Sequence, residues 1–405
     1  MKLNTLPIFL AFLLMGVADA MGPLSSQVSS SPVVAALMPF FVFIAFAVCS
    51  VPGGLLAARM GKKNLMLLGL ALNTIAVAVP AFMNPPFALL LACIFLLGVG
   101  TTFLQVAGNP IMRDVSPPGA FSRNLAMAQG IKGIGSTTMT ILATAGISLA
   151  FLPVLEKMEW RGVFPIFFVL MALALVFVAV LKVEETKADV PPSVGSSLAL
   201  LGQPVFALAV LGIFLYVGAE VCMATFLQPA LEGYGFAPSV AAWSGPVLFL
   251  GSLTVGRIVA GSVKVSAHTF FRLSAFLGLV GLVLMMTRIK ELALAGTVCS
   301  GLGFANIWPM LFSITVEEKP QCANELSGLM CMAISGGALV PLVMGKVISQ
   351  GLKQVETDKS WVLTDGTWVT LAFIVPAVCF AYLLLLSLKG SKKPAPPVPT
   401  PAVTA

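Results

Sequence analysis

Hydrophobic residues in this chain occur in long blocks separated by short polar segments. Most blocks reach about 20 residues, the length at which an α-helix crosses a hydrocarbon layer of about 30 Å. The strands of a membrane β-barrel are about ten residues long and alternate in polarity, which is a different pattern. The pattern predicts twelve membrane-spanning helices, at about residues 6–28, 34–57, 64–83, 86–112, 122–149, 163–183, 204–229, 239–262, 269–287, 291–315, 323–349 and 366–388.

A polar segment rich in Pro and Ser, residues 184–203, divides these helices into two sets of six. We therefore expect an all-α membrane protein with one six-helix bundle in residues 1–183 and a second in residues 204–388. Residues 389–405 are basic and then proline-rich, a composition that cannot bury enough apolar surface to pack. This tail is predicted to be disordered and cytoplasmic.

The first block contains "FLLMGVADAMGP", residues 12–23, a stretch that has two interpretations. The Ala18-Asp19-Ala20 triplet resembles the cleavage site of a signal peptide, and cleavage there would remove Asp19. Retention gives a first transmembrane helix with an acid at the depth of the bilayer. Because twelve spans form two matched sets of six only if the first is kept, we favour retention.

Composition agrees with a membrane location, since 58% of the 405 residues are hydrophobic and 10% are charged. A soluble domain has about 25% charged residues. The net charge of +7 does not indicate a nucleic-acid partner, because the basic residues lie in short loops. With both termini cytoplasmic, the cytoplasmic loops hold twice as many Lys and Arg residues as the opposite loops. We expect a multi-pass protein of the cell inner (plasma) membrane in that orientation.

Enzymatic chemistry has little support in the sequence. The seven cysteines fall mostly inside apolar blocks without paired spacing, and the one histidine, His268, lies in a predicted cytoplasmic loop. No motif for a metal site or an activated nucleophile is present. We therefore expect neither an enzyme nor a bound cofactor or metal. An enzyme or a non-transporting sensor is the disfavoured alternative.

The loop between the second and third blocks reads "GGLLAARMGKKNLMLLG". It resembles the major facilitator superfamily pattern G-x-x-x-D-R-x-G-R-K, which implies a cytoplasmic gate that includes Arg59 and Lys62. Ala58 stands where the family usually has an acid. The missing acid makes the gate weaker here, or another acid such as Asp114 or Glu318 replaces it.

Longer stretches narrow the resemblance. "FLQVAGNPIMRD" and "SRNLAMAQGIKGIGS" are similar to the fourth and fifth helices of the fucose and glucose/galactose permease family. "YVGAEVCMATFL", "GLGFANIWPMLFS" and "MAISGGALVPLVMGKVI" are similar to its seventh, tenth and eleventh helices. The resemblance covers nearly the whole chain. It implies two pseudo-symmetric six-helix bundles, the major facilitator fold, with a sugar site between them and cation-driven uptake.

Four charged residues lie well away from the ends of the predicted helices: Asp19, Lys132, Glu220 and Arg257. A charge at mid-helix costs about 2.5–3.5 kcal/mol on insertion scales, so such residues are paired or functional. Asp19 is our candidate for the cation-coupling carboxylate, neutralised by H⁺ or Na⁺. The resembling family carries its acid one turn later, near Pro23, so Asp19 is a displaced candidate. The alternative is a counter-ion for Lys132 without a coupling role.

Lys132 is the clearest departure from the family, which has asparagine at this position. One interpretation is a salt bridge with Asp19 that breaks and re-forms during transport. A second is direct binding of an anionic group on an acidic sugar. A third is a built-in cation that replaces or competes with the coupling ion. A purely structural pair is the fourth.

Amides at Gln105, Asn109 and Gln129 match the resembling family, and amides can bind sugar hydroxyls as both donors and acceptors. Some family members have Glu at the position of Gln105 and use it as a proton carrier, so proton transfer there is not expected in this chain. Asn109 is followed by Pro110, and this dipeptide is equally interpreted as a helix kink.

In the second half, Glu220 matches a family acid and is expected either to bind sugar hydroxyls or to hold a neighbouring helix. Asn306 and Trp308 are further substrate-binding candidates, because an indole face suits the C–H side of a pyranose. Trp308 could equally face lipid or the core. Arg257 lies near the cytoplasmic end of its block, so we expect it to snorkel there and serve the gate.

Together these features predict a secondary active transporter that imports a monosaccharide of the hexose or deoxyhexose class. We expect cation-coupled symport with Na⁺ or H⁺, alternating access and a monomer in the lipid bilayer. The alternative is a carrier for an acidic or amino sugar, with Lys132 binding the anionic group.

Overall fold

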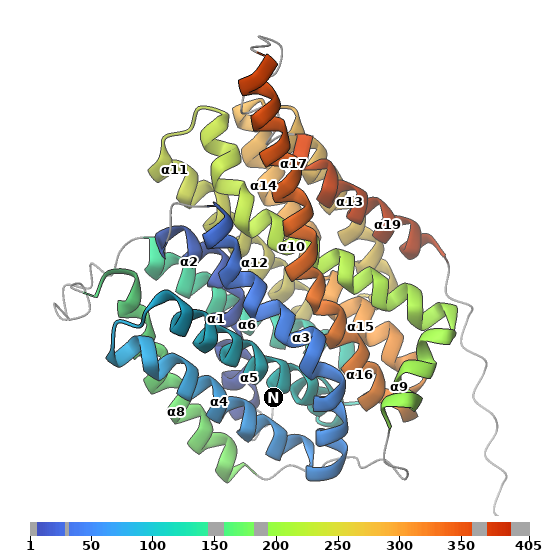
Figure 1. The fold of residues 1–405 in the computed structure, drawn as a ribbon. Coiled ribbons are helices and arrows are strands. Elements are labelled where there is room, and N and C mark those ends of the chain that lie inside the picture. The colour runs from blue at the N-terminus through green and yellow to red at the C-terminus, as the bar shows by residue number, and fades with distance from the viewer. Residues whose placement is uncertain (1–5, 29–31, 145–157, 182–192, 359–370, 390–405) are drawn as a thin grey trace, which may run out of the picture.

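The computed structural model describes residues 6–28, 32–144, 158–181, 193–358 and 371–389, all in helices and short connections (Figure 1). The first half comprises α1 (Leu6–Asp19), α2 (Met21–Val28), α3 (Pro32–Met60), α4 (Lys62–Phe82), α5 (Phe87–Asp114), α6 (Phe121–Thr144) and α8 (Val163–Val180). The second comprises α10 (Pro204–Gly233), α11 (Pro238–Ala242), α12 (Leu248–Ser262), α13 (Ala267–Met286), α14 (Lys290–Phe304), α15 (Ile307–Glu318), α16 (Ala323–Met332), α17 (Gly336–Asp358) and α19 (Ile374–Leu388).

Each of the twelve predicted spans contains a helix, although several spans are divided. The first consists of α1 and α2, and the tenth of α14 and α15. The eighth joins α11 to α12 through a π-helical turn, η4 (Trp243–Val247), and the eleventh joins α16 to α17 through a 3-10 turn, η6 (Ala333–Ser335). Within the described ranges, nine helical segments are long and apolar enough to cross a membrane, and α1 and α19 are shorter apolar helices.

The predicted linker is partly ordered. Residues 193–202 form α9 (Val194–Ala199) and a 3-10 turn, and the Ser193 hydroxyl accepts a hydrogen bond from the Ser196 amide at 3.0 Å. Residues 184–192 and 390–405 lie outside the described residues. The domain boundaries and the disorder of the tail therefore stay predictions.

The two halves repeat one packing motif, in which two neighbouring helices cross at glycines. In the first half α4 meets α5 at Gly69 and Gly100, and in the second α13 meets α14 at Gly281 and Gly296. A Cβ added at any of these glycines would lie 2.6–2.8 Å from the carbonyl oxygen of its partner glycine. Small residues allow such backbone approach in membrane bundles. The equivalent crossings display the pseudo-symmetry of the fold.

A second close crossing joins α1 to α6. A Cβ added at Gly16 would lie 2.4 Å from the Lys132 carbonyl oxygen, and one at Gly135 would lie 1.9 Å from that of Leu13. Only glycine allows these backbones to approach so closely. The crossing places the end of α1, at Asp19, beside the middle of α6.

Prolines account for two of the helix breaks. Pro23 has no N–H to donate to the carbonyl of Asp19, and α1 ends at that residue. Pro309 likewise leaves the carbonyl of Ala305 without a helical donor, and the chain changes from α14 to α15 there. Both breaks lie beside the polar cavity described next.

Candidate functional site

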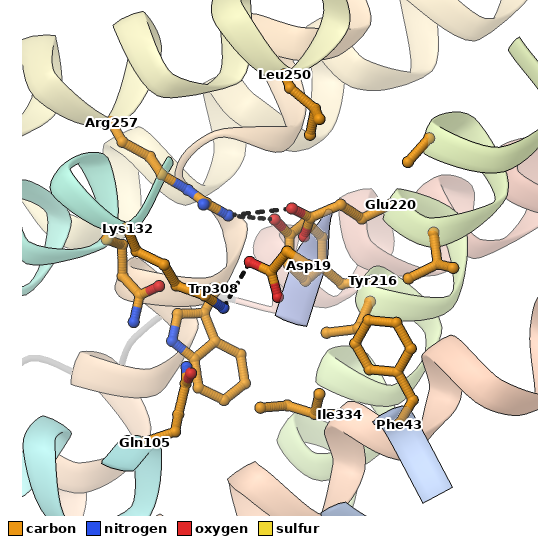
Figure 2. Close-up of a pocket in the computed structure, with 14 residues that line it drawn as sticks. Asp19, Phe43, Gln105, Lys132, Tyr216, Glu220, Leu250, Arg257, Trp308 and Ile334 are labelled. Atoms are coloured by element: carbon orange, nitrogen blue, oxygen red, sulfur yellow. Dashed lines mark hydrogen bonds and ion pairs between the residues drawn. The ribbon is translucent and has the colours of Figure 1, made fainter. Parts of the chain in front are cut away.

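A narrow cavity lies between the two halves, with a volume of about 50 Å³, room for a few waters, and charged and amide side chains interrupt its mostly apolar wall. Figure 2 shows its side chains, which converge from helices of both halves. The lining residues are Asp19, Phe43, Gln105, Gln129, Lys132, Tyr216, Val217, Glu220, Val221, Ala224, Leu250, Arg257, Trp308 and Ile334.

The first half contributes one ion pair to this cavity. Lys132 Nζ lies 2.8 Å from Asp19 Oδ2, across the glycine crossing of α1 and α6 (Figure 2). The Asp19 side chain is 24% exposed and that of Lys132 is 10% exposed. The pairing considered from the sequence is therefore present, and the carboxylate is its more accessible member.

The second half contributes another ion pair. Arg257 Nη2 lies 3.4 Å from Glu220 Oε1 and donates to the Tyr216 hydroxyl at 3.1 Å (Figure 2). Arg257 Nε donates to the carbonyl of Ala305 at 3.0 Å, the carbonyl that Pro309 leaves open. The Glu220 side chain is 18% exposed and that of Arg257 is 4% exposed. Here too the acid faces the cavity and the base lies behind it.

The expectation that Arg257 snorkels to the membrane surface is wrong. Its guanidinium is buried in the wall of the cavity, because the open carbonyl and the Glu220 carboxylate both lie on that side. Gly256 lets α12 approach closely, since a Cβ there would lie 2.6 Å from that of Ala305. The bonds that Arg257 gains inside replace those it would make with water.

Three buried side chains present unpartnered polar atoms in the wall of the cavity. They are Gln105 Oε1, Gln129 Nε2 and Trp308 Nε1, none of which has a hydrogen-bond partner among the described residues. Buried polar groups are usually paired, so unpaired ones in a cavity indicate a ligand or water that completes them. Trp308 thus faces the cavity rather than lipid. One acceptor and two donors suit a polyhydroxylated ligand.

Two predicted substrate ligands do not line the cavity in this structure. The Asn109 amide nitrogen lies 3.8 Å from Cys331 Sγ, and that of Asn306 donates to the Gly256 carbonyl at 3.3 Å. The rotation of each helix turns these amides toward a neighbouring helix instead. Contact of either asparagine with substrate stays a prediction for another stage of the transport cycle.

Of the two basic residues predicted for the gate in this loop, Lys62 makes an ion pair and Arg59 makes none among the described residues. Lys62 lies 2.5 Å from Asp114, so one of the two acids proposed to replace the one missing at Ala58 is in place. Glu318, the other, makes no ion pair among the described residues. Arg59 is exposed and has no ion pair within the described parts of the chain.

Contacts between the halves close this end of the molecule, which we call the basic end after Arg59, Lys62 and Arg113. Arg113 lies 3.2 Å from Glu317, across the two halves. The Ser327 hydroxyl donates to the carbonyl of Val106 at 3.1 Å. Pro110 leaves that carbonyl without a helical donor, so the position of this proline in the sequence already marks Val106 as an open acceptor.

No group of three His, Cys, Asp or Glu side chains that could hold a metal ion occurs within the ranges that the structure describes. The polar groups of the cavity are instead two ion pairs, two amides, one indole and one phenol.

Comparison with known proteins identifies the fold. The family model of the Major Facilitator Superfamily matches residues 6–342. A glucose/galactose transporter of Brucella abortus biovar 1 (strain 9-941) is 29% identical over 371 residues, which cover 88% of this chain and 85% of the relative. An L-fucose-proton symporter of Escherichia coli (strain K12) is 25% identical over 396 residues, covering 87% and 84%.

A solved structure agrees with this result. The crystal structure of the major facilitator transporter FucP in the outward conformation superposes with a TM-score of 0.73 at 20% identity, covering 95% of this chain and 98% of that one. The predicted fold class, two pseudo-symmetric six-helix bundles, is confirmed, as is the expectation of a multi-pass membrane transporter rather than an enzyme.

Proposed function

The chain belongs to the Major Facilitator Superfamily, and we propose that it imports a monosaccharide of the hexose or deoxyhexose class by cation-coupled symport. The observation that carries this proposal is the central cavity. Both halves line it, and it presents unpartnered atoms of Gln105, Gln129 and Trp308 beside two carboxylates. Rocking of the two halves about such a site would expose it to each side of the membrane in turn.

Sugar hydroxyls match the chemistry of these groups. Gln105 can accept a hydrogen bond, while Gln129 and Trp308 can donate one, so ring hydroxyls would complete atoms that are now unpaired. Glu220 adds a strong acceptor, and the indole of Trp308 provides an apolar surface for the C–H side of the ring. The names of the relatives, a glucose/galactose transporter and an L-fucose-proton symporter, support a sugar substrate.

Coupling is assigned to Asp19, with Lys132 modulating it. Asp19 is the carboxylate that the first half contributes to the cavity wall, and it ends a broken helix whose last carbonyl lacks a helical donor. Binding of H⁺ or Na⁺ at this position would change the charge of the site as substrate loads. The name of the L-fucose-proton symporter favours H⁺.

The basic end is assigned to the cytoplasm, in the inner (plasma) membrane, with both termini on that side. The Lys62–Asp114 and Arg113–Glu317 pairs would then form the cytoplasmic gate, and they would separate when the site opens inward. We also propose that residues 1–183 and 204–388 move as the two bodies, joined by residues 184–203, and that the transporter acts as a monomer.

A second candidate is a carrier for an acidic or amino sugar. The observation that favours it is Lys132, which brings a buried ammonium group to the cavity wall. The resembling family has a neutral asparagine there. An ammonium group can bind a substrate carboxylate once it is released from Asp19.

Uptake by the purified full chain in proteoliposomes tests the proposal. A panel of labelled neutral, acidic and amino sugars is offered while Na⁺ and H⁺ gradients are imposed separately. We expect accumulation of a sugar under one of the gradients, and Asp19→Asn should abolish accumulation while sugar exchange persists. Absence of flux for every sugar would refute the proposed function, and accumulation by Asp19→Asn would refute the role of Asp19.

A further inference from the structure

We propose that the site carries a monosaccharide bearing a carboxylate together with one proton, and that Lys132 exchanges Asp19 for the substrate carboxylate as Asp19 is protonated. This inference rests on the proposed sugar symport. Of the two candidate substrates it takes the acidic sugar rather than the neutral hexose, and of the two candidate ions it takes H⁺. It follows from the charges that line the cavity and from the way each is held.

The empty site is electrically balanced. Two acids, Asp19 and Glu220, face two bases, Lys132 and Arg257, and each acid is paired within its own half. These four and Tyr216 are the titratable side chains among the described residues that line the cavity. An isolated charge is costly in a low-dielectric interior, whereas a paired one is far less so. The empty carrier can therefore reorient without an added ion.

This balance changes what a proton can do. At a lone carboxylate, a proton removes the charge and permits reorientation, so it couples readily to a neutral sugar. Here Lys132 already neutralises Asp19 at 2.8 Å. A proton alone would leave the ammonium of Lys132 unpaired, and an anion alone would leave one negative charge too many. A proton and a monoanionic sugar together restore balance, so only the empty and the doubly loaded carrier are neutral.

The two bases differ in their freedom to change partner. Arg257 keeps its bonds to the Ala305 carbonyl and the Tyr216 hydroxyl whether or not Glu220 is ionised. Lys132 Nζ has Asp19 as its only hydrogen-bond or ion-pair partner among the described residues, which leaves two of its N–H groups unused. Lys132 is therefore the base that changes its ion-pair partner, and Arg257 keeps its partners throughout.

The neighbours of Lys132 suit the rest of the ligand. Gln129 lies on the same helix one turn earlier, and Gln105 and Trp308 complete the wall. A carboxylate at Lys132 would thus place the ring hydroxyls of the same sugar near the three unpartnered atoms. The other charges that face Asp19 across the cavity, Glu220 and Arg257 of α10 and α12, already neutralise each other.

The exchange balances in atoms and charge. A proton from water on the open side binds Asp19, whose carboxylate becomes a neutral acid, and its ion pair with Lys132 breaks. Lys132 stays an ammonium group throughout and forms a new ion pair with the sugar carboxylate. On the other side the sugar leaves, Asp19 releases its proton to water, and the original pair re-forms. One sugar anion and one proton cross, so no net charge moves.

The test uses two probes that differ only at C6, D-glucuronate and D-glucose, with the purified full chain in proteoliposomes. A pH gradient and a valinomycin-set membrane potential are imposed separately. We expect the pH gradient, acid outside, to drive accumulation of D-glucuronate, and we expect the potential to have no effect on it. D-glucose should equilibrate without accumulating.

Two variants and a control locate the exchange. Lys132→Asn should lower D-glucuronate uptake by about tenfold or more, since a charged hydrogen bond is lost. Asp19→Asn imitates the protonated acid, so D-glucuronate exchange should persist while its dependence on pH and its accumulation disappear. Lys264→Asn, at an exposed position outside the cavity, should behave as the unmodified chain.

The outcomes separate this inference from the proposed function. Accumulation of D-glucose driven by the potential would overturn the charge-balanced mechanism while leaving sugar symport intact. D-glucuronate uptake that Lys132→Asn leaves unchanged would also overturn it. Absence of flux for both probes would refute the inference and count against sugar transport itself.

Discussion

The two ion pairs of the cavity look alike in charge but are built differently. In the first half, the Asp19–Lys132 pair depends on a backbone crossing of two helices at Gly16 and Gly135. In the second half, Arg257 is held by side-chain bonds to a carbonyl and a hydroxyl in addition to its acid. Among the residues that the structure describes, Lys132 has one partner and Arg257 has three. This difference is the reason we propose that the first pair exchanges partners during transport and that the second holds its bundle together.

The largest expected effect on stability comes from replacing Arg257, the base with more partners among the described residues. Arg257→Gln would leave the Glu220 carboxylate and the Ala305 carbonyl without their donor, which should cost about 3 kcal/mol of stability. Lys132→Asn should cost about 1 kcal/mol, because the acid it leaves behind is more accessible to water. Thermal unfolding of the two purified variants in detergent, followed by tryptophan fluorescence, measures the difference. Equal losses would contradict the division of roles.

A second prediction concerns the crossing that positions the first pair. In Gly135→Ala, the added methyl group would meet the Leu13 carbonyl at 1.9 Å, so α1 and α6 must move apart. We expect about 1–3 kcal/mol of destabilisation and a longer Asp19–Lys132 distance. Gly251→Ala is the matched control, because nothing lies within 4 Å of its added Cβ. Similar unfolding temperatures for both variants would refute a positioning role for the crossing.

The sequence identified the four embedded charges because a charge inside an apolar block is energetically conspicuous. It also offered the Asp19–Lys132 pair as one of several interpretations of Lys132, since both residues lie deep in their predicted spans. The partners of Arg257 depend on which carbonyl lacks a helical donor and on how closely α12 approaches α14. Pro309 indicates that the Ala305 carbonyl lacks a helical donor. The close approach of α12 to α14 depends on tertiary packing and cannot be predicted from a local pattern.

It was harder to predict which amide side chains point into the cavity. In a soluble protein a polar stripe shows how a helix is rotated, but in helices such as α10 most residues on every side are apolar. Gln105 and Asn109 lie one turn apart on α5, yet only Gln105 reaches the cavity. The limit is physical, because lipid and protein core both accept the same apolar side chains.

A third prediction removes one of the supports of Arg257. Tyr216→Phe deletes the hydroxyl that accepts from Nη2 at 3.1 Å and leaves the bond to Ala305 intact. We expect a loss of about 1 kcal/mol, smaller than that of Arg257→Gln. The same unfolding assay checks it. A loss as large as that of Arg257→Gln would mean that Tyr216, rather than the carbonyl, holds the guanidinium in place.

The smallest effect is expected where the two halves meet at the basic end. The Arg113 and Glu317 side chains are 27% and 54% exposed, and such a pair contributes about 0.2–1 kcal/mol. Arg113→Gln should therefore leave the unfolding temperature nearly unchanged and shift the equilibrium between closed and open halves at this end by about fivefold at most.

The reactivity of Cys331 measures that opening, because this residue is buried beside Asn109 of the other half. Its rate of alkylation by N-ethylmaleimide, read by peptide mass spectrometry, should rise in the variant and not in Lys264→Asn. An unchanged rate would mean that the Ser327–Val106 bond and apolar packing keep this end closed without the ion pair.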